Sequence, residues 1–186
     1  MTDAVNNRRK NNMRTVRTKV FKFNELTDKA KQTAIENLYT INVDFDWWES
    51  TYEDAEQIGL KITSFDLDRN RHAKGMFLDN GINCAKLILE SHGEMCETYK
   101  TAKSFLAEIE QIETNFESLD TSDFDNIQEK EDAIQDAESD FLNSILEDYS
   151  IIMQNECEYL QSDEAIAETI IANDYEFTQD GKIFNS

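Results

Sequence analysis

The sequence contains no proline and only 5 glycines among its 186 residues. Proline breaks helices and glycine weakens them, so their scarcity favours long helices over a loop-rich β fold. Hydrophobic residues still make up 39% of the chain. That share is enough for a folded core and argues against a wholly disordered protein, and the length predicts one domain or a domain with an appendage.

Cysteines and long apolar runs are also scarce. The chain has 3 cysteines at irregular spacing, and no apolar segment opens it. No run approaches the roughly 18 apolar residues that cross a bilayer. This pattern is typical of a reduced compartment, so we expect a cytoplasmic protein that makes no membrane contact.

Positive charge is the most unevenly distributed property. The chain has 18 Lys and Arg against 39 Asp and Glu, a formal net charge of -21, and Lys130 is the only basic residue between Ser104 and Asp180. By contrast, the first 31 residues are basic. So large a negative charge repels nucleic acid and attracts basic surfaces. The partner that we expect is therefore a basic protein, bound at its nucleic-acid-binding groove, and not nucleic acid itself.

Signatures of catalysis are missing. The sequence holds only 2 histidines, and it has neither a glycine-rich phosphate loop nor a nucleophile elbow. Carboxylate pairs such as Asp44 and Asp46 arise by chance in so acidic a chain. We predict a non-enzymatic protein without catalytic residues or a cofactor.

Metal-binding spacings are weak as well. Calcium loops beginning at Asp66 or Asp123 lack the required glycine or oxygen ligands. A zinc site would need distant residues to converge without any C-x₂-C pair, and free cysteines are more often core residues. We predict no metal. The residues that such a zinc site would use are Cys84, His92, Cys96 and Cys157.

Hydrophobic periodicity predicts the secondary structure. Helices are expected over residues 26–41, 43–58, 80–91, 94–119, 122–160 and 162–172. Strands are expected over 14–23, 60–68 and 73–79, with a C-terminal hairpin around a type I′ turn at Asp180-Gly181. Thr27 should cap the first helix and Asp44 or Asp46 the second, and Gly59 should end the second in a left-handed conformation. A β-bulge is expected near Ser64.

These elements predict an α+β fold. A small antiparallel sheet would combine the N-terminal strand, the central hairpin and the C-terminal hairpin. The two longest helices would form an antiparallel pair because their connection is short. We expect residues 1–13 to be a disordered extension and residues 14–186 to be one domain, from which an acidic helical hairpin protrudes at about 94–160.

An acidic stripe is the strongest functional candidate. On a helix, six carboxylates recur every three or four residues, apart from one gap at Asn143, opposite or beside a predicted apolar row of Phe124, Ile127, Ile134, Phe141, Ile145, Tyr149 and Ile152. Their axial spacing of about 5–6 Å is of the same order as the 3.4 Å between phosphates along one DNA strand. A plain solvated face is the alternative interpretation. The stripe consists of Asp125, Glu129, Asp132, Asp136, Asp140 and Glu147.

The adjacent pair Trp47 and Trp48 is the second candidate. Neighbouring helical residues point about 100° apart, so one tryptophan can be an exposed anchor for a partner, as tryptophan often is at interfaces. The alternative is that both pack over the sheet with Phe45 and Tyr52.

Three segments carry a resemblance to a known group. "RTVRTKVFKFNELTDKAKQTAIE", "DFDWWESTYEDAEQIGLKI" and "ANDYEFTQDGKIF" resemble phage- and prophage-encoded proteins that are commonly labelled antitoxins of toxin–antitoxin stability systems. The resemblance covers most of Arg14–Phe184. It implies a phage or mobile-element origin, a place in the cytoplasm of a bacterial host cell, and an α+β fold with both termini in one sheet. It implies no chemistry.

Two hypotheses follow. The first is a phage or mobile-element inhibitor of a host defence protein, of the anti-CRISPR or anti-restriction type, whose acidic helical face mimics DNA. The second is an antitoxin that neutralises a basic toxin by direct binding. Direct DNA binding through the basic segment "RRKNNMRTVRTK" is weaker, because the net charge opposes it.

Overall fold

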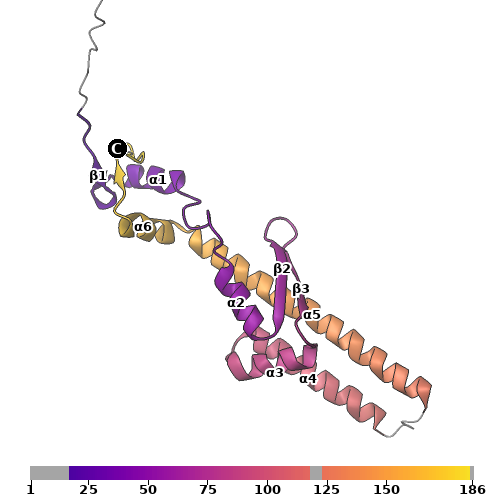
Figure 1. Cartoon of the computed structure of the whole chain (residues 1–186). Helices are drawn as coiled ribbons and strands as arrows, with labels where there is room; N and C mark the ends of the chain where they lie inside the picture. The colour runs from indigo at the N-terminus through magenta and orange to yellow at the C-terminus, as the bar shows by residue number, and fades with distance from the viewer. Residues whose placement is uncertain (1–16, 118–122, 185–186) are drawn as a thin grey trace, which may run out of the picture. The chain divides into compact units, whose positions relative to one another are not determined.

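The computed structural model describes residues 17–117 and 123–184, and the predicted extension at 1–13 lies outside them. Its helices and short antiparallel strands confirm the α+β fold. The chain divides into two compact units, one of which combines both terminal regions (up to Ile41 and from Asp163), while the other spans Asn42–Ser162. The sequence had predicted one domain over residues 14–186. Figure 1 labels most elements of both units.

The terminal unit brings the two ends of the chain together. Strand β1 (Phe21–Lys22) pairs antiparallel with β4 (Glu176–Phe177), as the predicted sheet of both termini requires. A 3₁₀ helix, η1 (Phe23–Glu25), follows β1, and α1 (Asp28–Asn37) and α6 (Asp163–Ala172) complete the unit. Thr27 caps α1 as predicted, because its side chain accepts a hydrogen bond from the backbone N–H of Ala30.

A close turn follows β4. The N–H of Gly181 donates to the carbonyl of Thr178 at 3.0 Å, and Gly181 has φ of 83°. The predicted type I′ turn is wrong, because it needs positive φ at Asp180 too, and Asp174 is the only described non-glycine residue with positive φ. Asp180 instead accepts a hydrogen bond from Thr178 and pairs with Lys182. The result is a turn followed by a left-handed glycine, a common hairpin connection.

Gly181→Ala should destabilise the terminal unit by more than about 2 kcal/mol. An added Cβ would lie 2.1 Å from the carbonyl oxygen of Ala30 and would sit on a backbone with positive φ. Gly93→Ala is the matched control, because the nearest heavy atom to its Cβ would be 4.0 Å away. Chemical unfolding followed by circular dichroism measures both. Equal stability of the two variants would contradict the predicted clash.

The central unit contains a β-hairpin and four helices. Its elements are α2 (Glu49–Gln57), β2 (Leu60–Asp66), β3 (His72–Phe77), α3 (Gly81–Ser91), α4 (Glu97–Phe116) and α5 (Phe124–Leu160). The hairpin β2–β3 is as predicted, including a register shift between Ile62 and Ser64, and Gly59 has the expected positive φ of 79°. Within the described residues, β2–β3 and β1–β4 are two separate two-stranded sheets.

One predicted helix start was wrong. Helix α2 begins after Trp48, which occupies the capping position, and neither Asp44 nor Asp46 caps it. A backbone hydrogen bond from the N–H of Glu49 to the carbonyl of Asp46 marks a turn before the helix. Both tryptophans contact Phe65 of β2, so they pack against the hairpin at the point where the helix begins.

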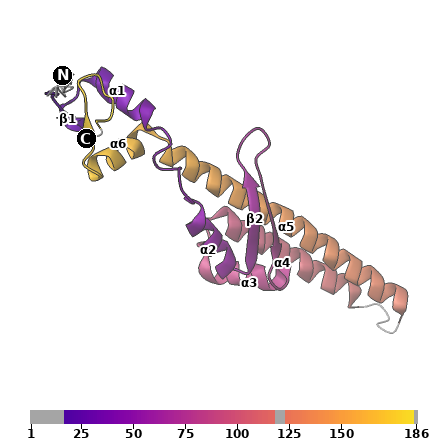
Figure 2. The same ribbon diagram turned by 45° about the horizontal axis from the view of Figure 1, so that its top comes forward.

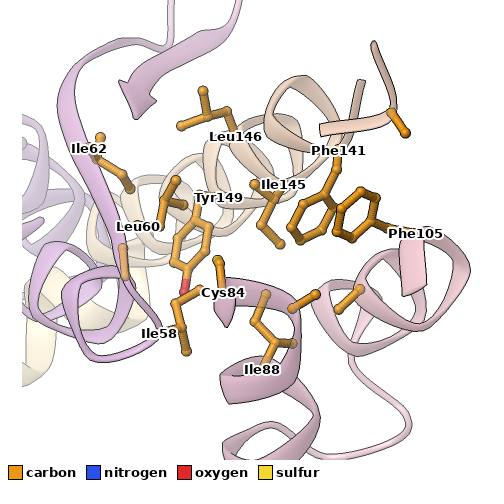
Figure 3. Close-up of a cluster of buried hydrophobic side chains, with 14 of the residues drawn as sticks. Ile58, Leu60, Ile62, Cys84, Ile88, Phe105, Phe141, Ile145, Leu146 and Tyr149 are labelled. Atoms are coloured by element: carbon orange, nitrogen blue, oxygen red, sulfur yellow. The ribbon is translucent and has the colours of Figure 1, made fainter. Parts of the chain in front are cut away.

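Helices α4 and α5 form the predicted antiparallel pair and lie side by side in both views (Figures 1 and 2). Thr101 of α4 binds Asp148 of α5, while Phe105 stacks on Phe141 with ring centroids 4.3 Å apart. The same stretch of α5 also packs against β2, β3 and α3, so much of this helix supports the central unit rather than protruding from it. Figure 3 shows the side chains of this core.

The buried row of α5 winds around the helix. Its members recur every four residues, so each step advances the row by about 40° at 3.6 residues per turn. They are Ala137, Phe141, Ile145, Tyr149 and Met153. The predicted apolar row was therefore partly wrong: Phe124, Ile127 and Ile152 are 74%, 42% and 40% exposed. Phe124 and Ile127 come before the buried row begins. Ile152 lies on the side of α5 that is buried near Phe141, but at the level of Ile152 the buried side of the helix has rotated away from it.

Candidate functional site

The six predicted stripe residues lie on one face of α5, and all are exposed. At 100° per residue they fall within a sector of about 80°. Among the described residues no ion pair involves the first five, from Asp125 to Asp140. Lys130 follows Glu129 directly, so its side chain points about 100° away from that carboxylate. The structure thus brings together five unneutralised carboxylates on one continuous helix.

Glu147, the sixth residue, differs from the others. The guanidinium of Arg71 binds its carboxylate, and it also donates to Ser150 Oγ at 3.1 Å and to Gln154 Oε1 at 2.7 Å. Arg71 comes from the turn between β2 and β3 and fastens that turn to α5. The carboxylates that are available to a partner therefore run from Asp125 to Asp140. The charge of Glu147 is already balanced by Arg71.

Trp47 and Trp48 are both half-buried. Their rings contact each other edge to face, at 5.7 Å between centroids, and both contact Phe65, which Tyr52 also touches. This agrees with the packing alternative, although Phe65 takes the place that Phe45 was expected to fill. Phe45 is 61% exposed. The tryptophans therefore have a packing role, and each keeps part of its surface accessible.

The cysteines do not gather around a metal. Cys84 is buried, Cys96 is exposed and Cys157 is half-buried, and no group of three metal-ligating side chains occurs in the described residues. Burial raises the pKa of the Cys84 thiol to about 12, so it stays protonated and behaves as a small apolar core residue. No helix in the described ranges is both long and apolar enough to span a membrane.

A cleft of about 540 Å³ lies among α2, the α3–α4 connection and the C-terminal half of α5. Tyr149, whose ring is fully buried, donates to Asp54 Oδ2 at 2.7 Å. His92 Nε2 lies 3.7 Å from the same oxygen, and its Nδ1 is 2.7 Å from Thr98 Oγ1. This polar chain fixes one wall of the cleft. Sequence reasoning missed the cleft, because its residues come from four helices that share no local motif.

Asp148 lines the same cleft. Burial raises the pKa of its carboxyl; a hydrogen bond from Thr101 acts in the opposite direction, and the nearby charges of Glu97 and Glu147 raise the pKa further. A raised pKa means that the folded protein holds this carboxylate less favourably than water does. The carboxylate of Asp148 is therefore under-compensated within the described structure.

Asp148→Asn should raise the melting temperature at pH 7. In the folded state the pKa of Asp148 lies above its unfolded value, so the folded state binds more protons between the two values and stability falls as pH rises through that window. Asparagine removes the charge and keeps an acceptor for Thr101. The gain should therefore shrink as pH falls through that window toward about 4, the ordinary pKa of aspartate, and should be absent below it. Thermal unfolding by circular dichroism between pH 3.5 and pH 7.5 measures it.

Asp136→Asn is the matched control, because Asp136 is exposed on the stripe. Its effect on unfolding free energy should stay within about 0.5 kcal/mol, as for other surface substitutions. A lower melting temperature for Asp148→Asn than for the wild type at pH 7 would contradict the burial cost assigned to Asp148.

Comparison of the chain with known protein families, with curated proteins and with solved structures found no significant match.

Proposed function

We propose that this protein is a non-enzymatic inhibitor that binds the basic nucleic-acid-binding surface of another protein through the stripe from Asp125 to Asp140. Its target would be a host defence protein such as a CRISPR or restriction effector, and its source a phage or mobile element. The observation that carries the proposal is the row of five exposed carboxylates, none of them ion-paired within the described residues, on one face of a 37-residue helix.

The geometry of the stripe suits a nucleic-acid-binding groove. At 1.5 Å per residue, Asp125 and Asp140 are about 22 Å apart along the helix axis. A groove that holds a nucleic-acid strand meets a phosphate every 3.4 Å or so along the axis. The stripe offers a rigid array of charges at a somewhat wider spacing, and helical backbone hydrogen bonds hold that array in place before any partner arrives.

Long-range electrostatics support the same partner. A formal net charge of -21 attracts a basic groove and can raise the association rate by orders of magnitude at low salt. The same field opposes contact with nucleic acid. Trp47 and Trp48, through the part of their surface that stays accessible, provide a second, apolar contact in this proposal.

Reversing four stripe carboxylates should abolish the interaction. The variant carries Asp125→Lys, Glu129→Lys, Asp132→Lys and Asp136→Lys, and its affinity for the target should fall more than about tenfold, since each reversed charge repels the basic surface. Targets are identified by affinity capture from a bacterial lysate over a salt series, followed by mass spectrometry. Each captured protein is then purified, and its binding to DNA or RNA is measured with and without inhibitor.

The matched control reverses four exposed carboxylates elsewhere in the same unit: Glu56, Glu110, Glu113 and Glu117. It changes the net charge equally, so its affinity should fall less than about threefold at physiological salt. The proposal fails if both variants bind alike, or if the captured proteins bind nucleic acid equally well in the inhibitor's presence. Capture of a small toxin encoded beside the gene would favour the antitoxin alternative.

A further inference from the structure

The cleft beside Asp148 combines two kinds of wall. Asp54, Glu97 and Asp148 contribute carboxylates, and the side chains of Ile151 and Ile152 contribute an apolar surface. These two isoleucines are 37% and 40% exposed although they lie well inside the C-terminal half of a long helix. A cleft with acid at one side and aliphatic carbon at the other matches a ligand that is itself divided into a cationic head and an apolar stem.

No lysine or arginine is among the described residues that line this cleft. Lys100 binds Glu97 at 2.6 Å, but both side chains are largely exposed and such pairs contribute little. Asp54 is engaged by Tyr149 and His92. Asp148 receives a hydrogen bond from Thr101 but has no ion-pair partner in the described residues. The acid with the least compensation therefore lies beside the apolar wall.

The apolar stem of such a ligand would pack against the side chains of Ile151 and Ile152. A long side chain entering along Ile151 and Ile152 would bury its methylenes and bring its head to Asp148, and burial of that apolar surface is favourable. The head would meet several acceptors, because Glu97 and Asn155 line the same cleft. A guanidinium, which has five donors and is weakly hydrated, serves several acceptors in a partly dry site better than an ammonium does.

We propose that this cleft binds an arginine side chain of the partner protein, with the guanidinium at Asp148 and Glu97 and the stem against Ile151 and Ile152. The inference rests on the proposed function for the origin of the arginine. The stripe supplies attraction at a distance, and the cleft supplies a specific contact that fixes where the partner sits. Because the cleft can be tested with a small molecule, its failure and the failure of the inhibitor proposal are separable.

The test is a titration of the full-length ¹⁵N-labelled protein with N-acetyl-arginine methylamide, followed by two-dimensional NMR. We expect saturable, millimolar binding with shifts concentrated in residues 91–98 and 148–155. The uncharged isostere N-acetyl-citrulline methylamide should bind at least fivefold more weakly, and N-acetyl-lysine methylamide at least twofold more weakly. Shifts spread over the whole acidic surface, or equal binding of the citrulline compound, would overturn the proposal, and equal or tighter lysine binding would overturn the choice of arginine.

Two variants locate the site. Asp148→Asn and Glu97→Gln should each weaken arginine binding at least threefold, while their spectra show that the fold is retained. Asp136→Asn on the stripe should leave it unchanged. If Asp136→Asn weakens binding as much as Asp148→Asn does, the cleft is not the site. Arginine binding that persists in a protein that captures no nucleic-acid-binding target would support the cleft and refute the inhibitor function.

Discussion

The apolar row of α5 is the constraint on which the central unit depends. Because its members are four residues apart, the row turns by about 40° at each step and by about 160° between Ala137 and Met153. Phe141 faces α4 through its stacking on Phe105, and further along Tyr149 reaches Asp54 of α2. Different sides of α5 therefore pack against different elements along its length, and α2, α3, α4 and the hairpin are arranged around it.

The neighbours of α5 also explain where its charged features begin and end. From Asp125 to Asp140 the carboxylates lie well away from the buried row, so they stay exposed. At Glu147 the turn between β2 and β3 comes close to α5, and Arg71 neutralises this last carboxylate of the stripe. In the C-terminal half of α5 the buried row has rotated away from Ile151 and Ile152. These side chains stay exposed there and line the cleft. The cleft thus follows from the winding of the buried row, and the end of the stripe follows from the position of the hairpin turn.

Local patterns predicted what local chemistry determines. Thr27 as a cap, the left-handed Gly59, the bulge near Ser64 and the antiparallel helix pair all follow from neighbouring residues, and all were confirmed. The start of α2 and the exposure of Ile152 depend on Phe65 and on the winding of α5, which are tertiary effects. The stripe was visible because it lies on one helix. The cleft was not, because it needs residues from four helices.

Glutamine, rather than lysine, binds two of the carboxylates on α5. This choice of residue favours a functional acidic face over a face that is only solvated. Gln128 donates to Asp132 and Gln154 to Glu158, in each case across one helical turn. Lysine at such a position would keep the helix soluble and would add a charge-assisted contact of a few tenths of a kcal/mol. Glutamine satisfies the carboxylate oxygens but leaves their charge intact. The burial of Phe141 and Tyr149, each contributing about 1.5–3 kcal/mol, exceeds the repulsion that results, so α5 can retain a negative field. A basic partner would respond to that field, whereas solubility alone does not require it.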